Sequence, residues 1–355
     1  MKKIVVLAGD GIGPEIMASA LAVLKAACPD HLQRFHFDQR PFGGAALALT
    51  GEPLPQETLQ DCQQADAILL GAIGDPVWEN APITPEKGLL DLRQALGLYA
   101  NIRPIKVVDA VIALSPIKEA ILRGTDFVIV RELTGGIYFG EKAEKSEEAY
   151  DINHYHQAEI RRILRKAFEI ARTRKKRVLS VDKANVLATS RLWRRLAEET
   201  AQEFPDCHLT HQYVDSAAMK ILQNPKDFDV IVTENLFGDI LSDEASVLPG
   251  SLGVLPSASH GAEGVSLYEP IHGSAPDIAG QNCANPVSMI LSVVMMLRES
   301  FQEEELADTI ESACYEVMNA GILTRDLGGT ATTTAFTEAV IAQLGVSNYG
   351  ENAVR

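Results

Sequence analysis

The chain has 355 residues, of which 46% are hydrophobic and 23% charged, and its formal net charge is −16 at pH 7. These are ordinary values for a globular protein with one large or two smaller folded units. The negative charge repels nucleic-acid phosphates, so we expect no nucleic-acid partner. It also repels an anionic substrate unless arginines reverse the sign locally, which makes the placement of the arginines informative.

The cysteines and the apolar runs bear on the location of the protein. Five cysteines are scattered without CxxC spacing, at positions 28, 62, 207, 283 and 314. This pattern favours reduced thiols in the cytoplasm over a disulfide scaffold or a zinc site. The most apolar stretch, residues 286–297, is too short to cross a bilayer, so we expect no membrane partner. The first apolar run, residues 4–8, ends at Gly9 without a cleavage site and predicts a strand rather than a signal peptide.

Short apolar runs alternate with segments of helical periodicity along the chain. After the first strand, a glycine-rich turn leads into a predicted helix over residues 15–27. Further strands are predicted at residues 67–70, 110–114, 127–130, 178–181 and 230–233. Leu192, Leu196 and Thr200 repeat every fourth residue and predict a helix over residues 190–204. The alternation indicates an α/β fold with helices on both faces of a sheet.

Three segments have more than one interpretation. The turn from Gly9 to Gly13 resembles a dinucleotide fingerprint, but its third glycine comes too early and Pro14 follows, so we interpret it as a tight turn outside a Rossmann fold. Asn285 and Pro286 predict the start of an apolar helix through residue 297, in the core or at an oligomer interface. Residues 161–177 carry nine Lys and Arg and predict a solvated, amphipathic surface helix.

Two aspartates four residues apart could bind a cation. On a helix, Asp239 and Asp243 share one face, where two like charges call for a positive partner. Carboxylate oxygens suit Mg²⁺ or Mn²⁺, and Asp215 could supply a third. A solvated acidic face would have the same spacing.

A second face combines leucines with an arginine. Glu86, Leu89, Leu90 and Arg93 fall at helical spacing after Thr84, which could cap the helix, and this face could hold an aliphatic group beside a carboxylate. An ordinary core-facing helix has the same pattern. Arg103 and Arg131 are placed at strand ends, where each could bind a carboxylate or pair with a surface acid.

Two further residues could transfer protons. Lys183 follows the strand at residues 178–181, and Tyr138 lies in a glycine-rich loop over residues 134–140. A lysine near a cation-bound hydroxyl can act as a base, and a phenol can return a proton to carbon. Taken separately, neither position is distinctive.

Taken together, these segments resemble the isocitrate/isopropylmalate dehydrogenase family of β-hydroxyacid oxidative decarboxylases. The matching stretches cover nearly the whole chain: AGDGIGPE (8–15), GLLDLR (88–93), LYANIRP (98–104), RELTGGIYFG (131–140), SVDKANV (180–186), GDILSDEA (238–245) and EPIHGSAPDIAG (269–280). The resemblance implies two open α/β domains that share a large mixed sheet. The first domain would comprise residues 1–98 and 251–355 and bind the cofactor, and the second residues 99–250, with the active site in the cleft between them.

The resemblance also assigns roles to the residues described above. Arg93, Arg103 and Arg131 would bind the substrate carboxylates, with Glu86, Leu89, Leu90 and Asp215 also in contact with the substrate. Asp215, Asp239 and Asp243 would hold Mg²⁺ or Mn²⁺, Lys183 would be the base, and Tyr138 the acid. In a homodimer, Lys183 and Asp215 would come from the neighbouring subunit. The cofactor would contact residues mostly around the loop at 272–285: Glu86, Asn185, His272, Gly273, Ser274, Ala275, Pro276, Asp277, Ile278, Asn285 and Asp326.

Two positions narrow the implied activity. Leu89 and Leu90 stand where isocitrate dehydrogenases have polar residues, so the substrate would be 3-isopropylmalate, an intermediate of leucine biosynthesis, because burying a third carboxylate against leucines is unfavourable. Asp277 would bond the ribose hydroxyls and repel the 2′-phosphate of NADP, which favours NAD. The stretch at 74–85 departs from the usual family pattern. The alternatives are a dehydrogenase for malate, tartrate or homoisocitrate, or a catalytically silent binding protein.

Overall fold

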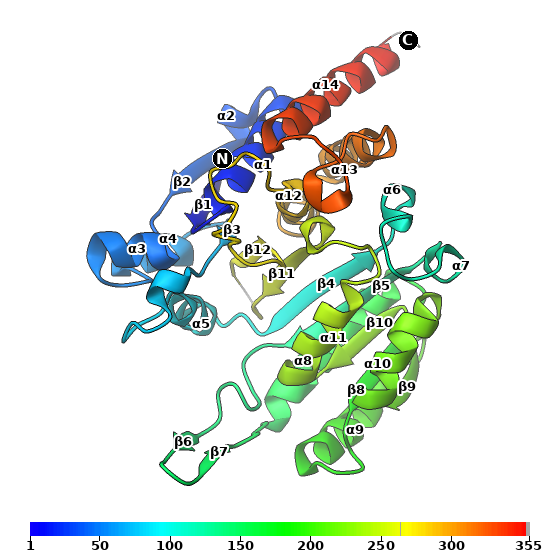
Figure 1. Ribbon diagram of the computed structural model, residues 1–355. Coiled ribbons are helices and arrows are strands. Elements are labelled where there is room, and N and C mark those ends of the chain that lie inside the picture. The colour runs from blue at the N-terminus through cyan, green and yellow to red at the C-terminus, as the bar shows by residue number, and fades with distance from the viewer. Residues whose placement is uncertain (263, 353–355) are drawn as a thin grey trace. The chain divides into compact units, whose positions relative to one another are not determined.

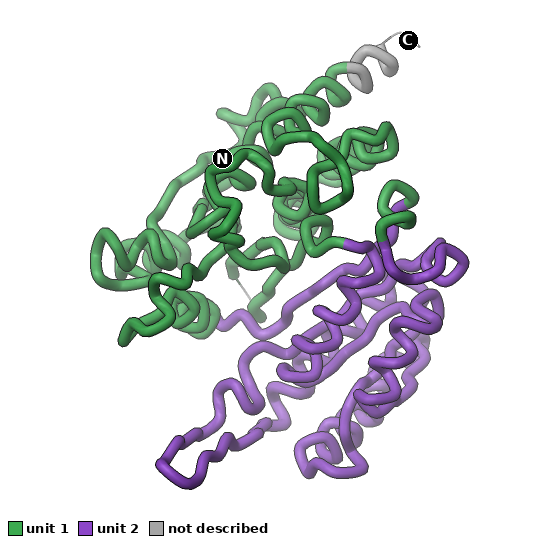
Figure 2. The backbone as a smooth tube through the Cα atoms, viewed as in Figure 1, with its two compact units in different colours: residues 1–96, 109–114, 251–355 green, residues 97–108, 115–250 purple. Residues whose placement is uncertain are grey.

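The computed structural model describes residues 1–262 and 264–352, with side chains described to residue 345. It divides into two compact units, which are coloured separately in Figure 2. Unit 1 comprises Met1–Leu96, Asp109–Leu114 and Ser251–Arg355, and unit 2 comprises Gly97–Val108 and Ser115–Gly250. None of the described helices is long and apolar enough to cross a membrane.

Unit 1 contains five strands, in the order β2-β1-β3-β12-β11 (Figure 1). β1, β2, β3 and β12 are parallel, and β11 is antiparallel to β12. Their bounds are β1 (Lys2–Gly9), β2 (Phe35–Gln39), β3 (Ala67–Ala72), β11 (Pro256–His260) and β12 (Ser266–Pro270). β3 is buried throughout and β1 is buried over residues 4–7, as their continuous apolar sequences require of central strands.

Helices α1 and α12 pack on this sheet, and α13 and α14 pack against them. The helices of unit 1 are α1 (Gly13–Ala27), α2 (His31–Arg34), α3 (Gly43–Thr50), α4 (Gln56–Gln63), α5 (Pro85–Ala95), α6 (Asp109–Ile112), α12 (Val287–Glu299), α13 (Glu304–Asn319) and α14 (Thr333–Asn352), with the short turns η1 (Pro76–Trp78), η3 (Leu252–Val254) and η4 (Arg325–Leu327). Every residue from 287 to 297 is buried, so α12 is a core helix.

Unit 2 contributes five strands to the large sheet, in the order β4-β5-β10-β8-β9. β4 is antiparallel to β5, and the others are parallel. α8 and α9 pack together on this sheet, and α10 and α11 form a second packed pair on it (Figure 1). The bounds are β4 (Ala100–Lys106), β5 (Asp126–Glu132), β8 (Arg177–Asp182), β9 (His208–Tyr213), β10 (Val230–Thr233), α7 (Glu119–Leu122), α8 (Gln157–Arg172), α9 (Ala188–Ala201), α10 (Val214–Gln223), η2 (Pro225–Asp227) and α11 (Asn235–Ala245). A separate hairpin joins β6 (Lys142–Glu144) to β7 (Ala149–Asp151).

The fold class is as predicted, a large mixed sheet with helices on both faces. Several local predictions were wrong. The apolar run at 110–114 is not a strand but overlaps helix α6, and Arg103 lies in the middle of β4 rather than at its end. The helix predicted over residues 161–177 ends at Arg172, and Arg177 is the first residue of β8. Pro286 is the N-cap of α12 rather than its first residue, although the Asn285 side chain does accept from Val287 N–H at 3.0 Å.

Candidate active site

Two of the three predicted metal ligands lie on α11, the helix that follows β10 in unit 2. Asp239 and Asp243 are one helical turn apart, and their side chains are 36% and 69% exposed. Arg131 Nη1 lies 2.5 Å from Asp239 Oδ1, and Arg103 Nη1 lies 3.4 Å from Asp243 Oδ1. The positive partners that this like-charged pair requires are thus the two arginines predicted to bind carboxylates.

These two arginines come from neighbouring strands. β4 and β5 pair with Asn101 opposite Arg131, and Arg103 follows two residues later on the same face. Arg103 donates from Nε to Asn101 Oδ1 at 2.7 Å and from Nη1 to Ser242 Oγ at 2.6 Å. Arg131 is buried and donates from Nε to Asn235 Oδ1 at 3.0 Å. Both guanidinium groups are therefore held in fixed orientations by neutral side chains.

Tyr138 joins the same cluster from its glycine-rich loop. Its hydroxyl donates to Asp239 Oδ2 at 2.7 Å. Burial, with the carboxylate of Asp239 beside it, raises the pKa of Tyr138, so the phenol stays protonated at neutral pH. The fully buried carboxylate of Glu132 holds the loop by accepting from Thr134 N–H at 2.9 Å and Gly135 N–H at 2.7 Å.

Lys183 and Asp215 form a second pair in unit 2. Lys183 Nζ donates to Asp215 Oδ1, and this hydrogen bond lowers the pKa of Asp215. The neighbouring Asp182 is fully buried and accepts two hydrogen bonds from Arg194 and one from Ala184 N–H, which fixes the strand end that carries Lys183. Across the described residues, no three His, Cys, Asp or Glu side chains are grouped so as to hold a metal, so one chain does not gather Asp215 with the α11 pair. Asn185 is exposed nearby in sequence.

The predicted aliphatic face lies on α5 in unit 1. Thr84 is its N-cap residue, but the Thr84 side chain makes no capping hydrogen bond. Leu89 is half-buried and Leu90 is 40% exposed, whereas the core position of this helix is Leu92. Arg93 Nη2 donates to Glu269 Oε1 at 2.7 Å, with both side chains largely buried. One helix thus carries two leucines that are not fully buried and an arginine whose charge is balanced by Glu269.

The predicted cofactor residues of unit 1 surround the loop after β12. His272 Nδ1 lies 2.9 Å from Gly273 O, and its buried Nε2 has no hydrogen-bond partner among the described residues. Burial lowers the pKa of His272, so the imidazole is neutral near pH 7 and Nε2 can bond a ligand. Asn285 Nδ2 donates to Asp326 Oδ2 at 2.9 Å, and Ser251 Oγ donates to the same oxygen at 2.6 Å.

The remaining loop residues divide by exposure and backbone shape. Ala275 adopts a positive φ of 40°, which bends the loop, and Asp277 is exposed immediately after Pro276. Gly273 is exposed, Ser274 is buried, and Ile278 is half-buried. Glu86 is exposed on the first turn of α5, with its Oε1 beside Gly74.

Several residues of these clusters were not predicted. Glu269, Asn235 and Ser242 each hold one of the predicted arginines, and Asp10 organises the turn after β1, as described below. Glu269 and Ser242 lie inside matching segments, EPIHGSAPDIAG and GDILSDEA, which is the signal that could have found them. Asn235 lies just outside the second of these.

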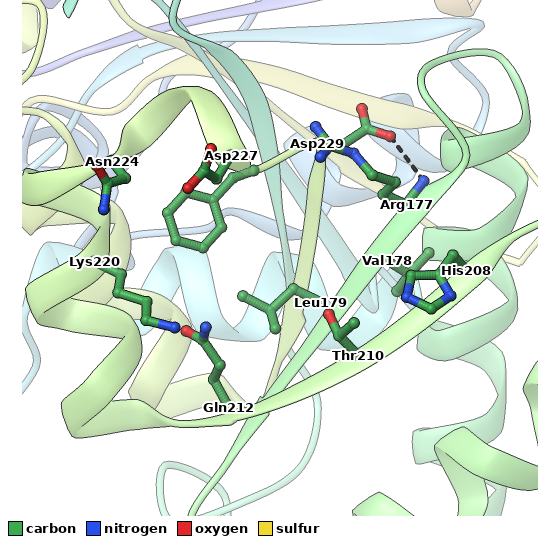
Figure 3. Close-up of a pocket in the computed structure, with 11 residues that line it drawn as sticks. Arg177, Val178, Leu179, His208, Thr210, Gln212, Lys220, Asn224, Asp227 and Asp229 are labelled. Carbon is green, nitrogen blue, oxygen red and sulfur yellow. Dashed lines mark hydrogen bonds between the residues drawn. The ribbon is translucent and has the colours of Figure 1, made fainter. Parts of the chain in front are cut away.

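A pocket of about 320 Å³ lies at the opposite end of the unit 2 sheet (Figure 3). Its lining includes Arg177 and His208, the first residues of β8 and β9, and Asp229, which accepts from Arg177 N–H at 3.0 Å. None of the predicted site residues lines it. Ligands of open α/β sheets bind at the carboxyl ends of the strands, so we place the active-site clusters there and not in this pocket.

Comparison with known proteins supports the same conclusion. The model of the isocitrate/isopropylmalate dehydrogenase family matches residues 3–340. A 3-isopropylmalate dehydrogenase from Streptococcus thermophilus is 61% identical over 343 residues, covering 97% of this chain and 99% of the relative. One from Listeria monocytogenes is 62% identical over 343 residues, covering 96% and 98%.

The chain belongs to the isocitrate/isopropylmalate dehydrogenase family. It is therefore an enzyme, an oxidative decarboxylase, as the sequence predicts. Solved structures of the family share its fold. Isocitrate dehydrogenase from Methylococcus capsulatus has a TM-score of 0.87 and 36% identity, covering 97% of this chain and 99% of that one. A beta-decarboxylating dehydrogenase from Thermococcus kodakarensis, in its apo form, has a TM-score of 0.81 and 37% identity, covering 97% and 96%.

Proposed function

We propose that this enzyme oxidises and decarboxylates 3-isopropylmalate with NAD, giving 4-methyl-2-oxopentanoate, CO₂ and NADH in leucine biosynthesis. The observation that carries the proposal is the 61% identity to 3-isopropylmalate dehydrogenases over nearly the whole chain, against 36% to the isocitrate dehydrogenase. Leu89 and Leu90 on α5 support it, because they offer an apolar surface to an isopropyl group and nothing to neutralise a third carboxylate.

Substrate binding falls to the arginines. Arg103 and Arg131 are held by neutral side chains and by the α11 aspartates, so a substrate carboxylate would meet guanidinium groups that are already oriented. Arg93, held by Glu269, would supply the third guanidinium. The fixed orientation lowers the conformational cost of binding a dianion to a chain of net charge −16.

The α11 aspartates fit a divalent cation. Their donor set consists only of carboxylate oxygens, one helical turn apart and at least one-third exposed, as Mg²⁺ or Mn²⁺ requires. Asp239 and Asp243 would hold the ion together with Asp215 of a second subunit, in a homodimer. When bound, the cation would polarise the substrate C2 oxygen and stabilise the negative charge that forms when CO₂ leaves.

Two side chains would move protons. Lys183 would accept the proton of the C2 hydroxyl as the C2 hydride leaves for the nicotinamide, which NAD supplies as the two-electron acceptor. After the bond between C3 and its carboxylate breaks, the Tyr138 hydroxyl would give its proton to C3.

The loop residues of unit 1 fit a dinucleotide. His272 offers a neutral, unpartnered Nε2, and the exposed carboxylate of Asp277 can accept hydrogen bonds from ribose hydroxyls. The same carboxylate would repel a 2′-phosphate, so NAD is preferred to NADP. Leucine biosynthesis would place the enzyme in the cytoplasm.

The test is a coupled assay of NADH formation and CO₂ release with the purified enzyme. 3-Isopropylmalate, isocitrate, homoisocitrate, malate and tartrate would each be supplied, with NAD or NADP. Each pair would be run with Mg²⁺, with Mn²⁺ and with a chelator. We expect the highest kcat/KM for 3-isopropylmalate with NAD, and loss of activity with chelator that either ion restores. A higher kcat/KM for any other acid would overturn the substrate assignment, and full activity in chelator would overturn the metal.

A further inference from the structure

Asp10 lies in the turn between β1 and α1 and is only 7% exposed. Its carboxylate accepts three backbone hydrogen bonds: from Gly44 N–H at 2.8 Å, Ala45 N–H at 2.7 Å and Gly74 N–H at 3.0 Å. Main-chain donors do not move independently of the fold. The carboxylate is therefore a fixed link between segments that are 34 to 64 residues away in sequence.

The donors come from two different segments. Gly44 and Ala45 belong to the first turn of α3, where backbone N–H groups lack partners within the helix and attract a negative charge. Gly74 follows β3 and adopts a positive φ of 103°. The approach is close, because a Cβ on Gly43 would lie 2.8 Å from Asp10 Oδ2. A side chain at position 43 would therefore crowd the carboxylate.

Both backbone polar groups of Gly74 are hydrogen-bonded. Its N–H donates to Asp10, and its carbonyl accepts from Ser274 Oγ at 2.5 Å. The backbone carbonyl of Ser274 in turn accepts a hydrogen bond from Ile12 N–H at 2.8 Å. A Cβ on Gly74 would lie 2.9 Å from Glu86 Oε1, so the first turn of α5 also approaches this residue. Hydrogen bonds thereby join the three loops that follow the carboxyl ends of β1, β3 and β12.

We propose that Asp10 is a positioning residue for the dinucleotide. By holding Gly74, it fixes the assigned cofactor contact Ser274, whose Oγ donates to the Gly74 carbonyl, and it keeps Gly74 close to the second assigned contact, Glu86, before the cofactor arrives. The inference rests on the proposed function, in which these two residues contact NAD. Since fixed contacts reduce the ordering cost of binding, loss of the link should weaken cofactor binding while leaving the charged cluster of unit 2 unchanged.

The test compares Asp10→Asn with wild type and with Asp66→Asn. A carboxamide at position 10 replaces one acceptor oxygen with an N–H₂ group that faces main-chain donors. Asp66 is the matched control, since its Oδ2 accepts from Lys3 N–H at 2.7 Å at the amino end of β1. We expect Asp10→Asn to raise both the KM for NAD and the Kd for NADH, measured by fluorescence, at least tenfold. The kcat at saturating NAD and the KM for the hydroxy acid should stay within about threefold of wild type.

Hydrogen exchange without cofactor adds a readout that does not depend on turnover. In Asp10→Asn, the amides of residues 73–78 should exchange faster, while those of β1 and β3 keep their protection. Should Asp10→Asn fail to fold, Gly74→Ala strains the same residue and should show the same selective loss of dinucleotide affinity. Unchanged dinucleotide affinity in a folded Asp10→Asn, or an equal loss in Asp66→Asn, would overturn the proposal.

The two proposals can fail separately. If the wild-type enzyme prefers another hydroxy acid or NADP, the proposed function fails in that respect, and the variants are compared with the dinucleotide that is used. If the wild type binds neither dinucleotide, the positioning role is overturned as well. If it uses NAD and 3-isopropylmalate but Asp10→Asn binds NADH normally, only the role of Asp10 is lost.

Discussion

Both units carry candidate functional residues in segments that follow parallel strands, but they build these sites from different groups. In unit 1 the loops are joined through backbone groups around Asp10, Gly74 and Ser274. In unit 2 charged side chains lie directly against one another, as Arg131 does against Asp239. The first arrangement suits recognition by shape and backbone contact, and the second suits stabilisation of changing charge. The difference predicts that variants of the proton-transferring residues of unit 2 should affect kcat, and that variants of the loops and the α5 face of unit 1 should affect binding and selectivity.

The largest effect should follow from Lys183→Ala in unit 2. Removal of the base should lower kcat for 3-isopropylmalate by about 10²- to 10⁴-fold, while the KM changes much less. Steady-state kinetics at saturating NAD and metal measure this split. Lys220→Ala is the matched control, because Lys220 is an exposed lysine on α10 at the opposite end of the sheet.

A Lys183→Ala enzyme with kcat within a few-fold of wild type would remove lysine from the mechanism. It would also weaken the contrast between the units, since the chemistry would then depend less on unit 2. An equal loss in Lys220→Ala would point instead to general damage, or to a role for the pocket at the amino ends of β8 and β9.

A smaller effect is expected from Leu89→Ser with Leu90→Val on α5 in unit 1. This change removes apolar surface from the face assigned to the isopropyl group, without altering a charged residue. The ratio of kcat/KM for 3-isopropylmalate to that for malate should fall about tenfold or more, because a few methylene groups contribute about 1–3 kcal/mol each in an apolar pocket. The control is Leu49→Ser on α3, where the leucine is 76% exposed. An unchanged ratio would contradict the assignment of this face.

Much of the fold could be predicted from the sequence, and so could the local geometry of the α11 aspartates. The spacing of Asp239 and Asp243 predicted their shared helix face, and the early third glycine with Pro14 correctly predicted a tight turn. The run at 110–114 was misinterpreted because a short apolar segment does not distinguish a buried strand from one helical turn. Arg103 was misplaced because Pro104 suggests a strand end, whereas β4 continues through it.

The supporting residues were harder to predict for a physical reason. Asn235 holds Arg131 across 104 residues, and Glu269 holds Arg93 across 176 residues. No local periodicity records such a pairing. Asp10 bonds only to main-chain groups through its side chain, and every residue except proline has such a donor, so the sequence of the partner gives no signal.

Two buried carboxylates that differ in their hydrogen-bond donors allow a finer test. Asp10 in unit 1 accepts three backbone N–H groups, whereas Glu234 in unit 2 accepts only from side chains, Ser190 Oγ at 2.5 Å and Asn153 Nδ2 at 3.3 Å. Burial raises the pKa of Glu234 above its ordinary value of 4.5. The native state therefore holds this proton over a range, from pH 4.5 upward, in which the unfolded chain has begun to release it.

The expected consequence is a small dependence of stability on pH. The contribution of Glu234 is fully present below pH 4.5 and is lost as the pH rises through the higher native value. Glu234→Gln keeps an acceptor for Ser190 and cannot ionise. Its stability relative to wild type, measured as the difference in the free energy of unfolding, should therefore be greater at pH 7 than at pH 5. Guanidinium unfolding at both pH values measures this difference, with the exposed Glu147→Gln as control. A difference that stays constant, or that reverses sign, would mean that the side-chain donors compensate Glu234 as fully as backbone donors would.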